Sequence, residues 1–252
     1  TPINVPYGHY LVGITQIRAD TSIAYGYQFN SPIRSETFFV TSPPGSSDWV
    51  DFADQNINFV LDIAPKTYLS LHVGVWLAGY YNGLTMIPDT VTVIAHSQIS
   101  PYIAYDTVRA VVGSGGIGTF NFCKLSNDSC YYYEIRQRNH LATWSHSLCE
   151  KIDECGKQYD FRNSISQAFG NNMLFIPPPP GDGAGGGFGT YGGDVDQDGS
   201  IGLLDLLPVY NDNVGFVTGY VVTDINGDLS VTLADVLITY NNNVAFISEI
   251  AP

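Results

Sequence analysis

The chain has 252 residues, of which 10 are Lys or Arg and 24 are Asp or Glu, so its formal net charge is −14. This length is enough for one large domain and one small one, each with a buried core. The negative charge argues against nucleic acid or an anionic membrane surface as a partner. No apolar run approaches the roughly eighteen residues of a membrane-spanning helix, so we expect no membrane span.

Residues 1–176 have the alternating pattern of β-strands. The clearest stretch is residues 67–79, in which Leu and Val alternate with small or polar residues. Only residues 140–155 read as a helix, and turn sequences separate the remaining runs. The pattern predicts a mainly β N-terminal domain, an antiparallel sandwich or jelly roll. Further strands are expected at residues 10–17, 22–29, 36–41, 57–63, 90–96 and 107–112.

Residues 177–192 are rich in Pro and Gly and predict a linker. Four consecutive prolines favour a stiff polyproline II spacer, and the glycines after them favour flexibility. We therefore expect three parts: a β domain over residues 1–176, this linker, and a small C-terminal module over residues 193–252.

The C-terminal module contains one acidic pattern twice, thirty positions apart. Each copy has oxygen-bearing side chains at positions 1, 3, 5, 7 and 12 of a twelve-residue segment, which is the ligand spacing of an EF-hand loop. Ca²⁺ takes six to eight oxygen ligands, so we predict two calcium ions and a module that depends on them. The predicted ligands are Asp194, Asp196, Asp198, Ser200 and Asp205 in the first loop, and Asp224, Asn226, Asp228, Ser230 and Asp235 in the second.

Each loop runs into an apolar segment, and residues 203–216 align with residues 233–246 without a gap. Each segment predicts a short amphipathic helix, and we expect the two apolar stripes to be buried only against each other. The stripes have i, i+3, i+4, i+7 spacing and consist of Leu203, Leu206, Leu207 and Tyr210, and of Leu233, Val236, Leu237 and Tyr240.

This doubled loop-and-helix pattern over residues 193–248 resembles a dockerin module, a tandem pair of calcium-binding units found in secreted bacterial assemblies. The resemblance implies an EF-hand-like α-helical fold, calcium binding and a cohesin-like partner. Three features depart from the family. Leu229 replaces the usual Gly at loop position 6, although Gly227 at position 4 can relieve strain, and Pro208 is expected to kink or shorten the first helix. Loop positions 10 and 11, polar in cohesin-binding dockerins, are Leu203 and Leu204 in the first copy and Leu233 and Ala234 in the second, so the resemblance supports calcium binding better than cohesin binding.

Four cysteines lie within 33 residues: Cys123, Cys130, Cys149 and Cys155. An even, clustered set in an exported chain indicates two disulfides. Of the three possible connectivities we expect local pairing, first with second and third with fourth. The alternative is a zinc site that also uses His140 and His146, for which the cysteine spacings are loose.

Asn127 lies in the one Asn-x-Ser/Thr sequence that we single out, and it is a candidate glycosylation site. The chain begins with Thr1, and its composition, with many Tyr and Gly and few Lys, is typical of secreted proteins. We expect a mature product whose export signal has been removed, located outside the cell or on its surface.

The sequence contains no Gly-x-Ser-x-Gly and no His-Glu-x-x-His motif, so we expect no enzyme. The alternative is a glycoside hydrolase that uses a pair of acids. Residues 113–118 match a dinucleotide-binding string, but a strand pattern follows them in place of a helix, which predicts a β-turn. The candidate acids are Asp48, Asp51, Asp54 and Asp62.

Aromatic side chains are more numerous than a core of this size needs, and exposed ones would bind sugars or proteins. The first hypothesis is an exported, non-catalytic structural protein, a calcium-stabilised subunit of an extracellular fibre or surface layer that binds neighbouring copies of itself. The alternative is a carbohydrate-binding domain that binds a glycan and is tethered by its dockerin to a cohesin scaffold. The aromatic candidates are Trp49, Tyr80, Tyr81, Tyr131, Tyr132, Tyr133 and Trp144.

Overall fold

The computed structural model describes residues 68–146, 150–180 and 186–252, and four short strands before them by their backbone. The chain divides into two compact units, Thr1–Lys66 and Thr67–Pro252. Strands are thus found within the predicted ranges 22–29, 36–41 and 57–63, whereas the predicted strand at residues 10–17 lies outside the described residues. In the first unit β1 (Tyr27–Gln28) pairs antiparallel with β4 (Asn58–Phe59), and β2 (Phe39–Thr41) pairs antiparallel with β3 (Trp49–Asp51).

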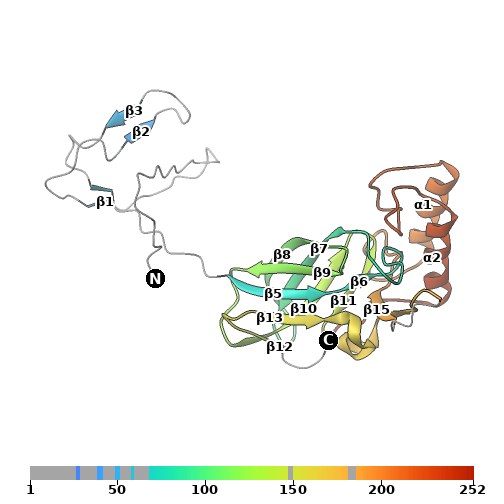
Figure 1. Cartoon of the computed structure of the whole chain (residues 1–252), viewed down its shortest axis with the longest axis horizontal. Coiled ribbons are helices and arrows are strands. Elements are labelled where there is room, and N and C mark those ends of the chain that lie inside the picture. The colour runs from blue at the N-terminus through green and yellow to red at the C-terminus, as the bar shows by residue number, and fades with distance from the viewer. Residues whose placement is uncertain are drawn as a thin grey trace. The chain divides into compact units, whose positions relative to one another are not determined.

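The second unit is mainly β, with two α-helices side by side at one end (Figure 1). Most strand pairs are antiparallel, as the sequence predicts, but β13 with β5 and β15 with β6 are parallel. One sheet has the order β11 (His140–Trp144), β10 (Ser129–Gln137), β7 (Asp89–His96), β8 (Ala104–Val112), with β12 (Glu150–Ile152) also on β10. The second has the order β13 (Lys157–Asp160), β5 (Leu69–Gly74), β9 (Ile117–Phe122), and a third has the order β14 (Leu174–Ile176), β15 (Gly187–Thr190), β6 (Trp76–Leu77).

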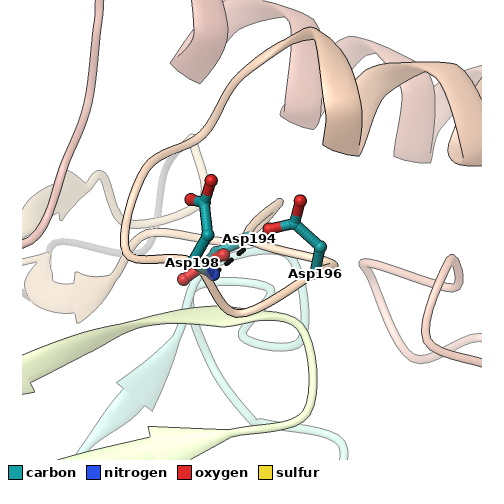
Figure 2. A group of neighbouring side chains, drawn as sticks. All are labelled: Asp194, Asp196 and Asp198. Atoms are coloured by element: carbon teal, nitrogen blue, oxygen red, sulfur yellow. Dashed lines mark hydrogen bonds between the residues drawn. The ribbon is translucent and has the colours of Figure 1, made fainter.

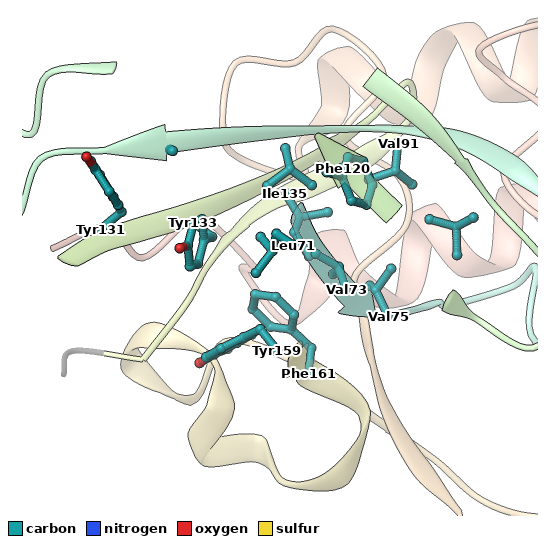
Figure 3. Packing of buried hydrophobic residues seen from close by; sticks show 14 of the residues in the cluster. Leu71, Val73, Val75, Val91, Phe120, Tyr131, Tyr133, Ile135, Tyr159 and Phe161 are labelled. Carbon is teal, nitrogen blue, oxygen red and sulfur yellow. The ribbon is translucent and has the colours of Figure 1, made fainter. Parts of the chain in front are cut away.

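One hydrophobic cluster fills the space between the first two sheets (Figure 3). Along β5, Leu69, Leu71 and Val73 are buried while His72 is exposed, which confirms the predicted alternation. Across the sheet Leu71 pairs with Phe120 of β9, and both are fully buried. The large buried side chains of β5, β7, β9, β10 and β13 therefore form a single core.

Two local predictions have clear outcomes. Residues 113–116 form the turn between β8 and β9, in which the N–H of Gly116 donates to the carbonyl of Gly113 at 2.8 Å, so the predicted β-turn is confirmed. The predicted helix at residues 140–155 is wrong, because β11 and β12 occupy its described part. All five residues of β11 are buried and the strand pairs with β10, and this tertiary burial overrides local propensity.

The predicted linker contains a strand. Gly187–Thr190 (β15) pairs with β14 before it and with β6, far away in sequence. Residues 181–185 lie outside the described residues. Three short 3₁₀ helices precede β14: η2 (Phe161–Asn163), η3 (Ile165–Gln167) and η4 (Phe169–Asn171). The sheets and the C-terminal helices share one compact unit, and the boundaries at residues 176 and 193 stay predictions.

The C-terminal repeats form α1 (Leu203–Val214) and α2 (Leu233–Val244), each of 12 residues. Pro208 does not shorten α1. The repeats interlock, because Ile201 donates to the carbonyl of Ile247 and Val231 to that of Val217, both at 2.9 Å. Neither helix is long and apolar enough to cross a membrane, nor is any other described one.

The aromatic residues proposed as exposed platforms are buried. Tyr80, Tyr133 and Trp144 are each less than 8% exposed, and Tyr131 and Tyr132 are also buried. Tyr81 is half-buried and its ring stacks on Trp76 with centroids 3.9 Å apart. The interpretation of the five buried residues as a surface for sugars is therefore wrong, while the side chain of Trp49 lies outside the described residues.

Phe120→Ala should lower the free energy of unfolding by about 3–5 kcal/mol, because it removes a fully buried ring from the shared core. Ile117→Ala on the same strand is the control, since Ile117 is half exposed, and it should cost only about 0.5 kcal/mol. Urea unfolding followed by circular dichroism would measure both. Equal effects of the two substitutions would contradict the described core.

Candidate metal centre and exposed helix face

Three acids of the first loop come together on one tight turn (Figure 2). The ligand oxygens of Asp194, Asp196 and Asp198 lie within 4.8 Å of one another. Asp194 is only 2% exposed, and its Oδ1 has no hydrogen-bond partner in the structure. A buried carboxylate oxygen without a donor is costly, and a cation would satisfy it.

The electrostatics of this turn favour a cation. Burial, together with the nearby carboxylates of Asp205, Asp198 and Asp196, raises the pKa of Asp194 to about 7. A divalent cation would reverse both effects, because it replaces lost solvation and compensates the adjacent negative charges. The donor set, carboxylates and a serine on a twelve-residue loop, fits Ca²⁺, a hard cation that binds oxygen ligands.

The acid at position 12 connects each loop to its helix. Asp205 Oδ1 accepts hydrogen bonds from the backbone N–H groups of Val195 and Asp196 at 2.7 and 3.1 Å, and its Oδ2 accepts one from Gly202 at 2.8 Å. Asp235 makes the equivalent contacts in the second loop, with Oδ1 accepting from Ile225 at 2.8 Å. Both acids are buried in the first turn of a helix, where a negative charge also favours the helix dipole.

The serines at position 7 follow the same pattern in both loops. Ser200 donates its backbone N–H to Asp198 Oδ1 at 2.8 Å, and Ser230 donates to Asp228 Oδ1 at 2.9 Å. The hydroxyl of Ser200 also donates to Asp198 Oδ1, at 2.9 Å. The serines thus orient the position-5 acids.

The second loop is organised differently around its first acid. Asp224 Oδ1 accepts from the N–H of Gly227 at 2.9 Å, and its Oδ2 accepts from Leu229 at 3.2 Å and from the guanidinium of Arg138 at 3.4 Å. At positions 3 and 5, Asn226 donates to Asp228 Oδ2 at 3.0 Å. Burial raises the pKa of Asp224, while the hydrogen bond from Leu229 and the charge of Arg138 oppose that shift.

Backbone geometry is shared by the loops although the glycines differ. Positions 4 and 6 have φ values of +59° and +88° in the first loop, at Gln197 and Gly199, and of +76° and +68° in the second, at Gly227 and Leu229. Leu229 therefore adopts the left-handed conformation that the missing glycine would favour, at some cost in strain. A side chain at Gly227 would collide with the ring of Tyr80, which explains the glycine at position 4.

Arg138 is a central residue at the junction that the sequence analysis missed. Its Nη2 donates to the hydroxyl of Tyr80 at 2.6 Å, its Nε lies 3.4 Å from Asp89 Oδ2, and its Nη1 donates to the carbonyl of Val221. Its guanidinium also lies 3.9 Å from the centroid of the Tyr220 ring. Burial lowers the pKa of Arg138, but Tyr80 and Asp89 outweigh that effect and raise it overall. An isolated Arg in a β-hairpin carries no sequence signal for such a role.

The predicted burial of the helix stripes is wrong for six of their eight residues, whereas Leu206 and Val236 are half-buried. Leu203, Leu207 and Tyr210 of α1 are more than half exposed, and their equivalents in α2 are also exposed. Asp205 and Val209 of α1 are buried in their place, because they face the loops. Between the helices lies a groove of about 370 Å³, lined by Leu203, Leu206, Leu207, Tyr210, Val236 and Tyr240.

The expected pairings of Cys123 with Cys130 and of Cys149 with Cys155 are both wrong. Cys123 and Cys155 are free thiols, and Cys130 is disulfide-bonded. Cys130 pairs with Lys151 of β12 in the sheet, which places Cys130 beside that strand and not beside Cys123. Cys149 lies outside the described residues.

The other candidate residues are placed as follows. His140 is buried, with Nε2 2.9 Å from the carbonyl of Ala78, and the disulfide of Cys130 contradicts the zinc alternative. Asn127 is exposed, so its glycosylation stays a prediction. The side chains of the proposed glycosidase acids Asp48, Asp51, Asp54 and Asp62, as well as the sulfur of Cys149, lie outside the described residues.

No protein-family model matches the sequence, and no curated protein matches it. Two crystal structures are similar to it, an N-terminal and a C-terminal interface mutant of the type II Cohesin-X-Dockerin complex from Acetivibrio cellulolyticus. They share 15% identity over 72% and 73% of this chain and 97% of the other chain, with TM-scores of 0.40 and 0.41. Likeness at this level carries no argument about function, which has to come from the site.

Calcium-free protein should lose stability between about pH 4 and pH 7 through Asp194. Its folded pKa of about 7 exceeds its ordinary value of 3.8, so this group stabilises the fold fully below pH 3.8 and ceases to do so as the pH rises through 7. Asp194→Asn should remove this pH-dependent contribution and also the stabilisation by calcium. Melting temperatures in excess EDTA and in calcium, for both proteins across this range, would measure it.

The difference in melting temperature between the wild type and Asp194→Asn isolates the contribution of Asp194. The lowered pKa values of Asp89, Asp106 and Asp160 make both proteins more stable as the pH rises, so their effect cancels in the difference. A wild-type profile in EDTA parallel to that of Asp194→Asn would contradict the prediction.

Proposed function

We propose that this chain is an extracellular, non-catalytic assembly protein with a dockerin-like module. Two calcium ions, bound by the loops of residues 194–205 and 224–235, would hold α1 and α2 in place. The exposed apolar face of the two helices would then bind a cohesin-type β-sandwich domain of another protein. The observation that carries the proposal is that both apolar stripes face solvent while the loops occupy the opposite sides of the helices.

An exposed apolar face of this kind favours binding. A surface helix normally turns its apolar side to the core. Here Leu204, Phe216 and Phe246 are 70%, 86% and 89% exposed, in addition to the stripes. Contiguous exposed apolar surface is typical of protein interaction sites, and large apolar and aromatic side chains are common at their centres.

The charge of the module favours a different protein over a second copy as the partner. After Arg162 the chain has ten acids and no Lys or Arg. Two calcium ions would compensate four of these charges, so two modules brought together would still repel each other. A partner with an apolar patch and a basic rim would be complementary. This favours the cohesin-type partner that the dockerin resemblance implies, and it places a fibre of identical copies second.

The glycan-binding alternative has lost most of its support in the described residues, because all the aromatic side chains proposed for it there are buried except Tyr81, which is half-buried and stacked on Trp76. A third possibility, catalysis by the early aspartates, involves residues whose side chains the structure does not describe. The helix face is thus the feature for which a binding role is best supported.

Leu207→Asp and Leu237→Asp should each weaken partner binding by about tenfold or more without unfolding the protein, because each places a charge in the exposed face. Val111→Asp is the matched control, because Val111 of β8 is about as exposed as these leucines, and it should leave binding unchanged. Isothermal titration with a panel of cohesin domains, including that of the Acetivibrio cellulolyticus complexes, would measure affinity in calcium and in EDTA.

Light scattering of the chain alone, in calcium and then in EDTA, separates the two kinds of assembly. A monomer that binds a cohesin only in calcium, through the helix face, supports the proposal. Large oligomers that Leu207→Asp disperses would show self-assembly through the same face. A calcium-loaded monomer that binds no member of the panel would contradict a cohesin-type partner.

A further inference from the structure

The two loops differ in charge. The first has four carboxylates, Asp194, Asp196, Asp198 and Asp205, at its predicted ligand positions. The second has three, because Asn226 replaces an acid, and Arg138 places a guanidinium 3.4 Å from the carboxylate of Asp224. No Lys or Arg lies within 30 residues of the first loop in sequence, and none of the ion pairs found in the described residues involves its acids.

Arg138 lies in the turn between β10 and β11 and is held there by contacts with the sheets and with the C-terminal repeats. Its side chain is 11% exposed and contacts Tyr80, Asp89, Tyr220 and the carbonyl of Val221. Asn139, the next residue, donates to the carbonyl of Asp224 at 2.7 Å and so fixes the backbone of the loop at the same point. The guanidinium is therefore a fixed positive charge beside the second loop and cannot turn away when a cation approaches.

The first acids of the two loops are correspondingly different. Asp194 has a buried oxygen, Oδ1, without a partner, whereas both carboxylate oxygens of Asp224 accept hydrogen bonds. Position 6 adds to the difference, because Gly199 tolerates positive φ and Leu229 does not do so without strain. Charge count and loop rigidity are the properties by which EF-hand loops tune calcium affinity.

We propose that Arg138, in the turn between β10 and β11, lowers the calcium affinity of the second loop. The first loop is then the tight site and the second the weak one. The inference rests on the calcium binding proposed above and goes beyond it. In the calcium-free state the guanidinium takes part of the role that an ion would have at Asp224. The second loop then stays attached to the sheets at calcium concentrations that fill only the first loop.

Calcium titration of the full chain by calorimetry tests this inference. We expect two sites whose dissociation constants differ by about tenfold or more. Asp196→Asn with Asp198→Asn should remove the tight site, and Asp228→Asn should weaken the other one. Arg138→Gln should tighten the weak site by about tenfold and leave the tight site within about twofold. Arg138→Lys, which keeps the charge, should stay close to wild type.

Asp89→Asn combined with Arg138→Gln avoids leaving the buried Asp89 without its counter-charge, and Asp89→Asn alone is its control. If these variants do not fold, the wild-type titration with the loop variants still decides the order of the sites. Equal affinities, a tight second loop, or a weaker second loop in Arg138→Gln would each overturn the inference. Absence of calcium binding at both loops would contradict the proposed function itself, which is a distinguishable result.

Discussion

The inward position of the acid at loop position 12 governs the arrangement of the C-terminal repeats. Asp205 and Asp235 are buried because their oxygens accept backbone N–H groups of the loops. Each acid lies in the first turn of a helix, so it fixes which side of that helix faces inward. Residues four positions on, Val209 and Thr239, are buried on the same side. Most leucines and tyrosines at the other helical positions consequently face solvent, and the exposed apolar face follows from the geometry of the loops.

Contacts with the sheets reinforce this orientation from the polar side. The indole N–H of Trp144 in β11 donates to Oε1 of Glu249, a residue that follows α2, at 2.6 Å. Asn242 of α2 donates to the carbonyl of Gly192 at 2.7 Å. Arg138 and Asn139 make the equivalent attachment at the second loop. Buried hydrogen bonds of this kind specify one relative orientation, because any other would leave polar groups unsatisfied. The helix pair is thus presented with its apolar face free of the sheets.

Local patterns in the sequence predicted much of this structure, and tertiary relations account for most of what they missed. The alternation around Leu71 and the repeat at Asp194 and Asp224 depend on neighbouring residues, and they gave the strand β5, both loops and both helices. The direction of the helix stripes could not be obtained in this way. An i, i+4 pattern of leucines marks an apolar side, but it does not say whether core or solvent lies against it.

The same limit applies to the candidate site. The spacing of the acids predicted a set of metal ligands, and the structure brings three of them, Asp194, Asp196 and Asp198, together. It could not show that the two loops are unequal, because Arg138 lies 86 residues before Asp224 in sequence. Nor could it show that a tyrosine such as Tyr133 fills the core, since aromatic residues serve core and surface equally well.

Charge and apolar surface act together in the function that we propose. The nine acids of residues 193–252, which contain no Lys or Arg, would keep copies of the module apart, while the leucines of the helix face favour association. Calcium would reduce the repulsion only in part, and it would hold in place the helices that present the apolar face. A face that is strongly apolar on a strongly acidic module discriminates by repulsion as well as by attraction, because an acidic partner is rejected even if its shape fits. On this argument the residual negative charge is part of the specificity, and it favours a basic-rimmed partner over any second copy of the chain.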